Sequence, residues 1–261
     1  MHGMQPPLPL ARRDVIAARL AGGQAVVATA LADEFEVSED AIRRDLRALA
    51  AEGRCRRVYG GALPITPQTQ PMFARADVSR ARKRALAQTA AGTIRAGEFL
   101  FLDAGSTNLA LVEFLPEDLA LTVATNAIDI AGAVLRRPDL RLVMIGGSVD
   151  TTVGGSVDSG AVQAVGRFDI DRCFLGACAV HAARGVGAEL DADALFKSTL
   201  VQASRQCVVL ALNEKLDARA PYRACTLADV DLLVVEHDAP AALTDPLRAA
   251  GARFAMADPA A

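Results

Sequence analysis

Cysteine and histidine are few in this sequence of 261 residues, and their spacing forms no metal-binding pattern. The five cysteines are an odd number without a CxxC pair, and the three histidines stand apart from any catalytic grouping of serine, cysteine and acid. Zinc sites, disulfide frameworks and nucleophilic triads all need such groupings. We therefore expect no metal site, no cofactor and no disulfide.

Long apolar runs and a secretory signal are also missing. Hydrophobic residues make up 52% of the sequence, but charges interrupt them before any run reaches the ~20 residues that span a bilayer. The opening MHGMQPPLPL lacks the basic segment and long apolar run of a signal peptide. These absences predict a cytoplasmic protein without a membrane partner. The length favours a small module joined to a larger one.

Lysine is nearly absent, with Lys83, Lys197 and Lys215 alone among 28 basic residues. Because the bias toward arginine affects the whole composition, the position of the arginines is more informative than their number. Residues 41–57 hold six arginines against two acids, although the formal net charge of the chain is −3. Such a local positive charge attracts a polyanion. A solvated surface face is the other interpretation of the same cluster.

The first 63 residues predict three short helices followed by a hairpin. Val15, Ile16 and Leu20 recur at helical spacing before a double glycine. A second apolar stripe follows in ALADEF. The alternating RCRRV, a YGG turn and ALPI then predict a two-stranded ribbon. Helices joined by a tight turn and followed by a basic hairpin are typical of a winged helix-turn-helix.

The third helix is predicted to carry charge and apolar residues on different faces. Ser38 is a good N-cap for it. Apolar residues at i, i+4 and i+7 should face the core, which turns the intervening arginines outward. The apolar positions are Ile42, Leu46 and Leu49, and the outward positions are Arg43, Arg44 and Arg47.

The segment from Arg12 to Ala62 resembles the N-terminal domain of DeoR-type bacterial transcriptional regulators, whose pattern runs VSxxTIRRDLxxLxxxGxxxRxxGGA. Ala41 departs from it, where the family usually has threonine, and this departure concerns fine sequence preference. Arginine suits bidentate contact with guanine, at ~1–3 kcal/mol of discrimination per contact. We expect duplex DNA as a partner. The predicted contacts are Ser38, Arg43, Arg44 and Arg47 in the helix, and Arg54, Arg56, Arg57, Tyr59, Gly60 and Gly61 in the hairpin.

The remainder of the chain predicts a larger α/β domain. Residues 64–77 are polar and punctuated by proline, which favours a linker. A basic helix follows over about 78–95, and then short apolar runs such as EFLFL, LTVAT and QCVVLAL alternate with helical stretches. This alternation indicates a mostly parallel sheet covered on both faces. We predict a winged helix-turn-helix over 1–63, a linker over 64–77, and an effector-binding and oligomerisation domain over 78–261.

The string LDAGSTN, residues 102–108, lies where an apolar run meets a helical one. Backbone N–H groups and hydroxyls in such a turn can point at an anion. Ordinary turn chemistry explains the same residue types equally well. The glycine-rich stretch over 146–160 lacks GxGxxG, so a dinucleotide site is not expected there.

The strings DAGSTN, ATN, IGG and DRCFLGA, with the lysines that follow, resemble the effector domain of the same DeoR-type regulators in order and spacing. The resemblance implies a fold similar to ribose-5-phosphate isomerase and an effector such as a phosphorylated sugar. The chain departs from the family pattern in three places: it has Asp193-Ala194 where the family has Glu-Ala, Leu212-Asn213-Glu214-Lys215 where the family has Asp ahead of a Ser-Lys pair, and Glu236 where the family has aspartate. The implied effector contacts are Asp103, Gly105, Ser106, Thr107, Asn108, Thr125, Asn126, Gly146, Gly147, Lys197 and Lys215.

Two functions fit these features. The first is a sequence-specific DNA-binding repressor relieved by a phosphorylated sugar or related metabolite, and the alternative is a sugar-phosphate isomerase-like enzyme with a basic N-terminal extension. Fold similarity does not separate them. The winged helix favours the regulator, because an isomerase has no use for it. Recognition modules of this size usually act in pairs, so we expect at least a dimer, assembled through the helix over 78–95 or the large domain.

Overall fold

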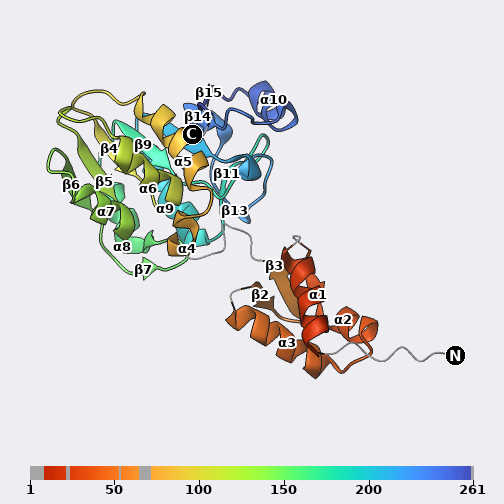
Figure 1. The fold of residues 1–261 in the computed structure, drawn as a ribbon. Coiled ribbons are helices and arrows are strands. Elements are labelled where there is room, and N and C mark those ends of the chain that lie inside the picture. Colours follow the sequence, from red (N-terminus) through yellow and green to blue (C-terminus); the bar gives the residue numbers. More distant parts are fainter. Residues whose placement is uncertain (1–8, 22–23, 53, 65–71, 260–261) are drawn as a thin grey trace. The chain divides into compact units, whose positions relative to one another are not determined.

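The computed structural model describes residues 9–21, 24–52, 54–64 and 72–259. The chain divides into two compact units, Met1–Gln70 and Pro71–Ala261, each with its own hydrophobic core (Figure 1). Within the stretch predicted as a linker, Pro64 ends a strand and Met72–Ala76 form helix α4. Residues 65–71 lie outside the described part of the chain, so the domain boundaries stay a prediction.

The first unit holds the three helices that the periodicity predicts. Ile42, Leu46 and Leu49 are almost fully buried, whereas Val15 is 42% exposed although it shares the spacing of its neighbours. Glu36 has a φ of 52°, a left-handed conformation that ends one helix and lets the chain turn into the next. The helices are α1 (Pro9–Ala21), α2 (Ala28–Glu34) and α3 (Glu39–Ala51).

The predicted ribbon is present and has a third strand. Strands β2 (Cys55–Val58) and β3 (Gly61–Pro64) form an antiparallel hairpin, and β1 (Val26–Val27) pairs with the outer side of β3. Two residues are too few to show strand periodicity, which explains why the sequence does not predict β1. The helices and this small sheet together form the winged helix-turn-helix.

The second unit contains a seven-stranded parallel sheet in the order β15-β14-β12-β9-β4-β5-β6, which confirms the α/β prediction. Its strands are β4 (Phe99–Leu102), β5 (Thr122–Thr125), β6 (Arg141–Met144), β9 (Arg172–Leu175), β12 (Cys207–Ala211), β14 (Leu232–Val235) and β15 (Phe254–Met256). Its helices are α4, α5 (Arg80–Ala91), α6 (Ser106–Leu111), α7 (Ile128–Val134), α8 (Ser159–Val165), α9 (Asp191–Gln202) and α10 (Ala241–Ala249).

The direction in which strands are added reverses between β4 and β9. From β4 the chain adds β5 and β6 on one side, and from β9 it adds β12, β14 and β15 on the other. Because parallel crossovers are right-handed, this reversal places α6 and α7 on one face and α9 on the opposite face. Helix α5 packs beside α6, and α8 packs beside α9 (Figure 1). Ligands of such sheets bind beyond the carboxyl ends of the strands at the reversal.

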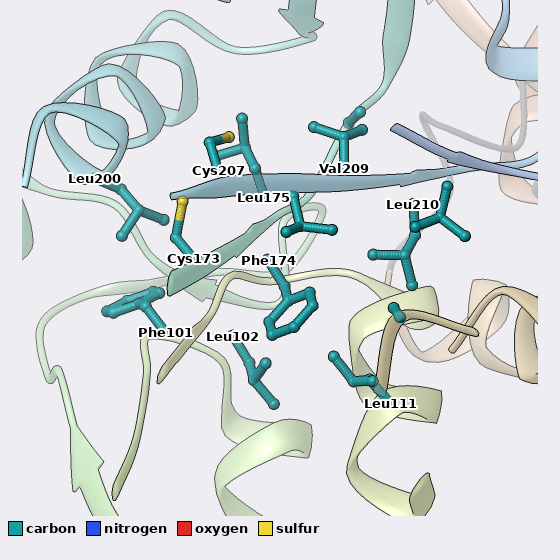
Figure 2. Packing of buried hydrophobic residues seen from close by; sticks show 14 of the residues in the cluster. Phe101, Leu102, Leu111, Cys173, Phe174, Leu175, Leu200, Cys207, Val209 and Leu210 are labelled. Atoms are coloured by element: carbon teal, nitrogen blue, oxygen red, sulfur yellow. The ribbon is translucent and has the colours of Figure 1, made fainter. Parts of the chain in front are cut away.

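The core follows the strict alternation of side chains along the central strands. Figure 2 shows Phe174 and Leu102 pointing toward Leu111 of α6, while Cys173 lies beside Phe101 and Leu200 of α9. The residues of β9 and β12 are buried without exception. Strands covered on both faces read as continuous apolar runs, which is why sequence reasoning finds them.

Two smaller sheets are absent from the sequence prediction. Strands β10 (Ala179–His181), β11 (Gly185–Ala188) and β13 (Tyr222–Cys225) form an antiparallel sheet, and β7 (Val149–Asp150) pairs with β8 (Gly155–Ser156). They are short and contain several glycines, so they lack a readable period. Among the described residues, no helix has the length and apolar character needed to cross a bilayer.

Candidate functional site

Helix α3 presents an arginine face opposite its buried face. The Ser38 hydroxyl caps the helix by accepting a hydrogen bond from the Ala41 backbone N–H at 3.3 Å. The side chains of Arg43, Arg44 and Arg47 are all exposed. The cap and the buried leucines thus fix the helix, while three guanidinium groups project from its other side.

Few intramolecular partners occupy these guanidinium groups. Arg43 Nη2 lies 2.7 Å from Glu39 Oε2, but the two side chains are 53% and 41% exposed, so the pair is weak. Arg47 Nε donates to the backbone carbonyl of Arg43 at 3.2 Å. Within the described ranges Arg44 forms no ion pair. The face is therefore available to an external anion.

The hairpin beside α3 ends in an exposed tip. Tyr59 is fully exposed, and Gly60 has a φ of 90°, which favours glycine. Arg54 and Arg57 are exposed, and Arg54 Nη1 lies 3.7 Å from Glu52 Oε2. The backbone of Arg56 belongs to β2, but its side chain lies outside the described part of the structure.

In the second unit, Asp103 lies directly after β4 and faces the end of β9, at the reversal of the sheet. It is fully buried. Its Oδ1 accepts from the Ala104 N–H at 2.8 Å, and its Oδ2 accepts from the Gly176 N–H at 2.8 Å. Lys197 Nζ, from α9, lies 3.0 Å from the same Oδ2. The two strand ends and α9 are thus joined at one carboxylate.

Lys197 is held between two carboxylates. It pairs with Asp103 and, one helical turn away, with Asp193; all three side chains are buried. Burial acts to lower the pKa of Lys197, but the negative charges of Asp103 and Asp193 outweigh it and raise that pKa above its usual value. Burial raises the pKa of Asp103. Two carboxylates facing one ammonium give this cluster a net negative charge.

Several predicted effector contacts are engaged with the backbone of the same edge. Asn108 Nδ2 donates to the carbonyls of residues 103 and 174 at 2.9 and 2.8 Å. Thr125 Oγ1 donates to the Leu102 carbonyl at 2.7 Å, and Asn126 Oδ1 accepts from the Ala104 N–H at 3.2 Å. All three are buried, so they hold the loops around Asp103.

The other predicted contacts lie at the start of α6, which follows β4, and on the loop after β6. Thr107 is buried, whereas Gly105 and Ser106 are partly exposed. Gly146 and Gly147 are exposed, and a Cβ at Gly147 would come within 2.8 Å of the Asp158 carboxylate. Ser156, which the sequence does not single out, has a buried hydroxyl without a hydrogen-bond partner among the described residues.

A second group of cations lies near Lys197. Lys215 donates to the Ala177 carbonyl at 2.6 Å, just beyond the end of β9. Lys83 and Arg75 belong to α5 and α4, and sequence reasoning does not assign them to this site. The scarcity of lysine is a signal that could have found Lys83. In an arginine-rich chain, all three lysines influence one electrostatic neighbourhood.

Comparison with known proteins finds a family model for each of the two units. A family model described as the DeoR C terminal sensor domain matches residues 78–237, and one described as the DeoR-like helix-turn-helix domain matches residues 12–68. The first match alone spans more than half of the chain. This chain belongs to the DeoR family. It is therefore a DNA-binding transcriptional regulator with a small-molecule sensor domain.

Relatives of this DeoR-family chain cover most of its length. The transcriptional repressor AccR of Agrobacterium fabrum is 30% identical over 79% of this chain and 81% of its own. The glycerol-3-phosphate regulon repressor of Escherichia coli K12 is 26% identical, over 83% of this chain and 86% of its own. Among solved structures, ribose 5 phosphate isomerase A from Neisseria gonorrhoeae matches 51% of this chain and 52% of its own at a TM-score of 0.37 and 18% identity. A likeness of that size carries no conclusion about activity.

Proposed function

We propose that this DeoR-family chain represses transcription by binding operator DNA through α3 and the β2–β3 hairpin. A phosphorylated sugar or related metabolite, bound at the carboxyl edge of the large sheet, weakens that binding. The observation that carries the DNA part is the amphipathic α3, whose guanidinium groups face away from a buried apolar stripe beside a projecting hairpin. The names of the relatives, which include a glycerol-3-phosphate regulon repressor, support the effector class.

In this proposal Arg43, Arg44 and Arg47 enter the major groove, and the capped start of α3 holds a phosphate. Arg54, Arg57 and Tyr59 contact the flanking backbone from the hairpin. An operator selected from random duplexes tests this. Replacing Arg43 or Arg47 by alanine should weaken binding by about 1–3 kcal/mol if the side chain reads a base.

The matched control is Arg167→Ala, since Arg167 is exposed in the second unit. Operator affinity should be unchanged in this control. In the α3 variants, the slope of log affinity against log salt concentration should fall by about one unit for each phosphate contact that is removed. Wild-type affinity in Arg43→Ala and Arg47→Ala would contradict the proposal that α3 reads the operator.

We propose further that the effector binds among Asp103, Ser106, Lys197 and their neighbours, and that the chain is not an enzyme. Both oxygens of Asp103 accept hydrogen bonds from the protein, which supports a binding role over that of a general base. Incubation with pentose and hexose phosphates tests both points. We expect operator release by at least one of them and no isomerisation, whereas measurable isomerisation would favour the enzyme.

We propose a homo-oligomer, at least a dimer, acting in the cytoplasm on paired half-sites. Helix α5, one of the elements suggested for assembly, places Leu86, Ala87 and Ala90 in the core of its own unit. Surfaces elsewhere on the large unit are therefore the better candidates for contact between copies. Sedimentation of the full-length chain, with and without operator, measures the state of assembly.

A further inference from the structure

Helix α7 is apolar on its outer side as well as on the side that faces its own unit. Ile130, Ala131 and Val134 are buried. Outside this buried arc, Ile128 is 53% exposed, and Leu135, directly after the helix, is 73% exposed. A helix with apolar residues on all sides is normally covered by other parts of a protein. The outer side of α7 therefore has the character of a surface that another molecule covers.

Further exposed apolar side chains lie beside this helix. Met144 ends β6, the edge strand of the large sheet, against which α7 packs. Val149 belongs to β7, whose partner strand β8 is bridged to Ala127, the residue before α7. Figure 1 shows α7 on the β6 side of the sheet. Single exposed apolar side chains are ordinary, but a group of them beside one helix is typical of an interaction surface.

Gly132 lies in the middle of the outer side of α7. Glycine inside a helix is destabilising relative to alanine. A Cβ at Gly132 would meet no described atom within 4 Å, so the packing of this chain does not require glycine at that position. Glycine allows a second backbone to approach closely. Gly132 is therefore suited to the point where a second helix crosses α7.

Two opposite charges flank the apolar side chains of this surface. Asp129 and Arg136 are exposed, and neither forms an ion pair among the described residues. Seven residues of helix rise about 10 Å, which is too far for the two side chains to pair with each other. On an antiparallel copy of the same helix, however, Asp129 of one copy lies beside Arg136 of the other, and this pair occurs twice. Such self-complementarity is typical of a two-fold interface between identical chains.

We propose that α7 packs antiparallel against α7 of a second copy of this chain, about a two-fold axis near Gly132. Ile128 of each copy then contacts Leu135 of the other. Asp129 of each copy pairs with Arg136 of the other. The homo-oligomer itself rests on the proposed function, and this inference names the surface through which the copies meet.

Sedimentation velocity of the full-length chain over a range of micromolar concentrations measures self-association, and circular dichroism checks that each variant is folded. Leu135→Asp should weaken association about tenfold or more, because the interface would bury a charge in place of an apolar side chain. Gly132→Leu should also weaken it, because the larger side chain holds the two helices apart. Leu195→Asp is the matched control, since Leu195 is an exposed leucine of α9. It should associate like the wild type.

Charge reversal tests the two-fold arrangement directly. Asp129→Arg places two arginines in each contact and Arg136→Asp places two acids there, so each variant alone should associate about tenfold more weakly than the wild type. An equal mixture of the two variants should recover most of the lost affinity, because each contact of a mixed dimer again pairs arginine with aspartate. Each reversal also disfavours its own end of the helix, but mixing does not repair that effect. Arg167→Asp and Asp245→Arg, at exposed positions, are the controls and should associate like the wild type, alone and mixed.

The proposal is overturned if the single variants associate like the wild type, or if the mixture associates no better than they do separately. A dimeric wild type that neither Leu135→Asp nor the charge reversals affect contradicts this surface but leaves the proposed homo-oligomer intact. A wild type that stays monomeric at every concentration contradicts both the surface and the homo-oligomer, whereas binding of operator DNA is measured independently.

Discussion

All three lysines of the chain influence one neighbourhood of the sensor domain, although arginine serves at most other basic positions. An ammonium group is compact and titrates readily when buried, whereas a guanidinium group does not lose its charge. At residue scale, the choice of lysine over arginine and the burial of the side chain together distinguish this neighbourhood from the other basic positions of the chain. Neither the net charge of the chain nor the number of its basic residues does so.

Lys83 should make stability depend on pH. Burial, followed by the positive charges of Lys215 and Arg75, lowers its pKa in the folded protein to about 8, against an ordinary value of 10.5, although the negative charges of Glu214 and Asp77 act to raise it. Between these values the unfolded chain binds more protons, so the free energy of unfolding rises with pH. The destabilisation is full below about pH 8 and is relieved by about pH 10.5, with a size of the order of 3 kcal/mol.

Urea denaturation of the wild type and Lys83→Met at pH 7 and pH 10 measures this effect. The wild type should gain stability relative to the variant as pH rises, because the variant has no proton to lose at this position. A constant difference between the two proteins would contradict the lowered pKa.

At the scale of elements, the hairpin depends on two neighbouring glycines for different reasons. A Cβ at Gly61 would lie 2.1 Å from the Val26 carbonyl oxygen, whereas a Cβ at Gly60 would meet nothing within 4 Å. Gly61 therefore permits the close approach of β1 and β3, and Gly60 supplies the left-handed turn.

Gly61→Ala should destabilise the first unit by about 2 kcal/mol or more, because backbone has to move. Gly60→Ala should cost about 1 kcal/mol, because it introduces backbone strain alone. Thermal unfolding followed by circular dichroism compares them. Equal midpoints for the two variants would show that β1 does not hold the hairpin as the structure indicates.

Sequence periodicity predicts the long elements and misses the short ones. Helix α3 and the buried strands β9 and β12 are found because their apolar residues repeat within a few positions. Strand β1 is missed because its two residues are too few to show a period. The same limit applies to the site, since Lys197 and Lys215 follow from family resemblance, while the burial of Lys83 depends on what α5 packs against.

At the scale of the whole molecule, the two units have separate cores with no residue in common. Within the first unit, Arg12 joins α1 to α3 through Asp45, with Nη2 and Oδ2 2.6 Å apart and side chains only 7% and 14% exposed. Removing one member of such a pair leaves the other charge poorly solvated. The stability of each unit should therefore respond to its own ligand and its own substitutions.

We expect two transitions in calorimetry of the full-length chain. Arg12→Ala should lower the stability of the first unit by about 2–3 kcal/mol and leave the second transition in place. Arg13→Ala is the control, since its pair with Glu52 is longer, at 3.6 Å, and partly exposed. Operator DNA should raise the transition of the first unit and leave the other in place. A single transition that moves as a whole in Arg12→Ala would contradict independent units.

The sequence by itself determines helix α3, the parallel sheet and the family, because each depends on patterns within short stretches of the chain. Capping at Ser38, the apolar stripe of α3 and the buried runs of the sheet are local properties. Only the tertiary structure decides that Arg75, Lys83 and Lys215 share one neighbourhood, because α4, α5 and the loop after β12 meet there through contacts between distant segments. Those contacts decide whether a basic residue is solvated, since burial removes the water that would otherwise stabilise its charge.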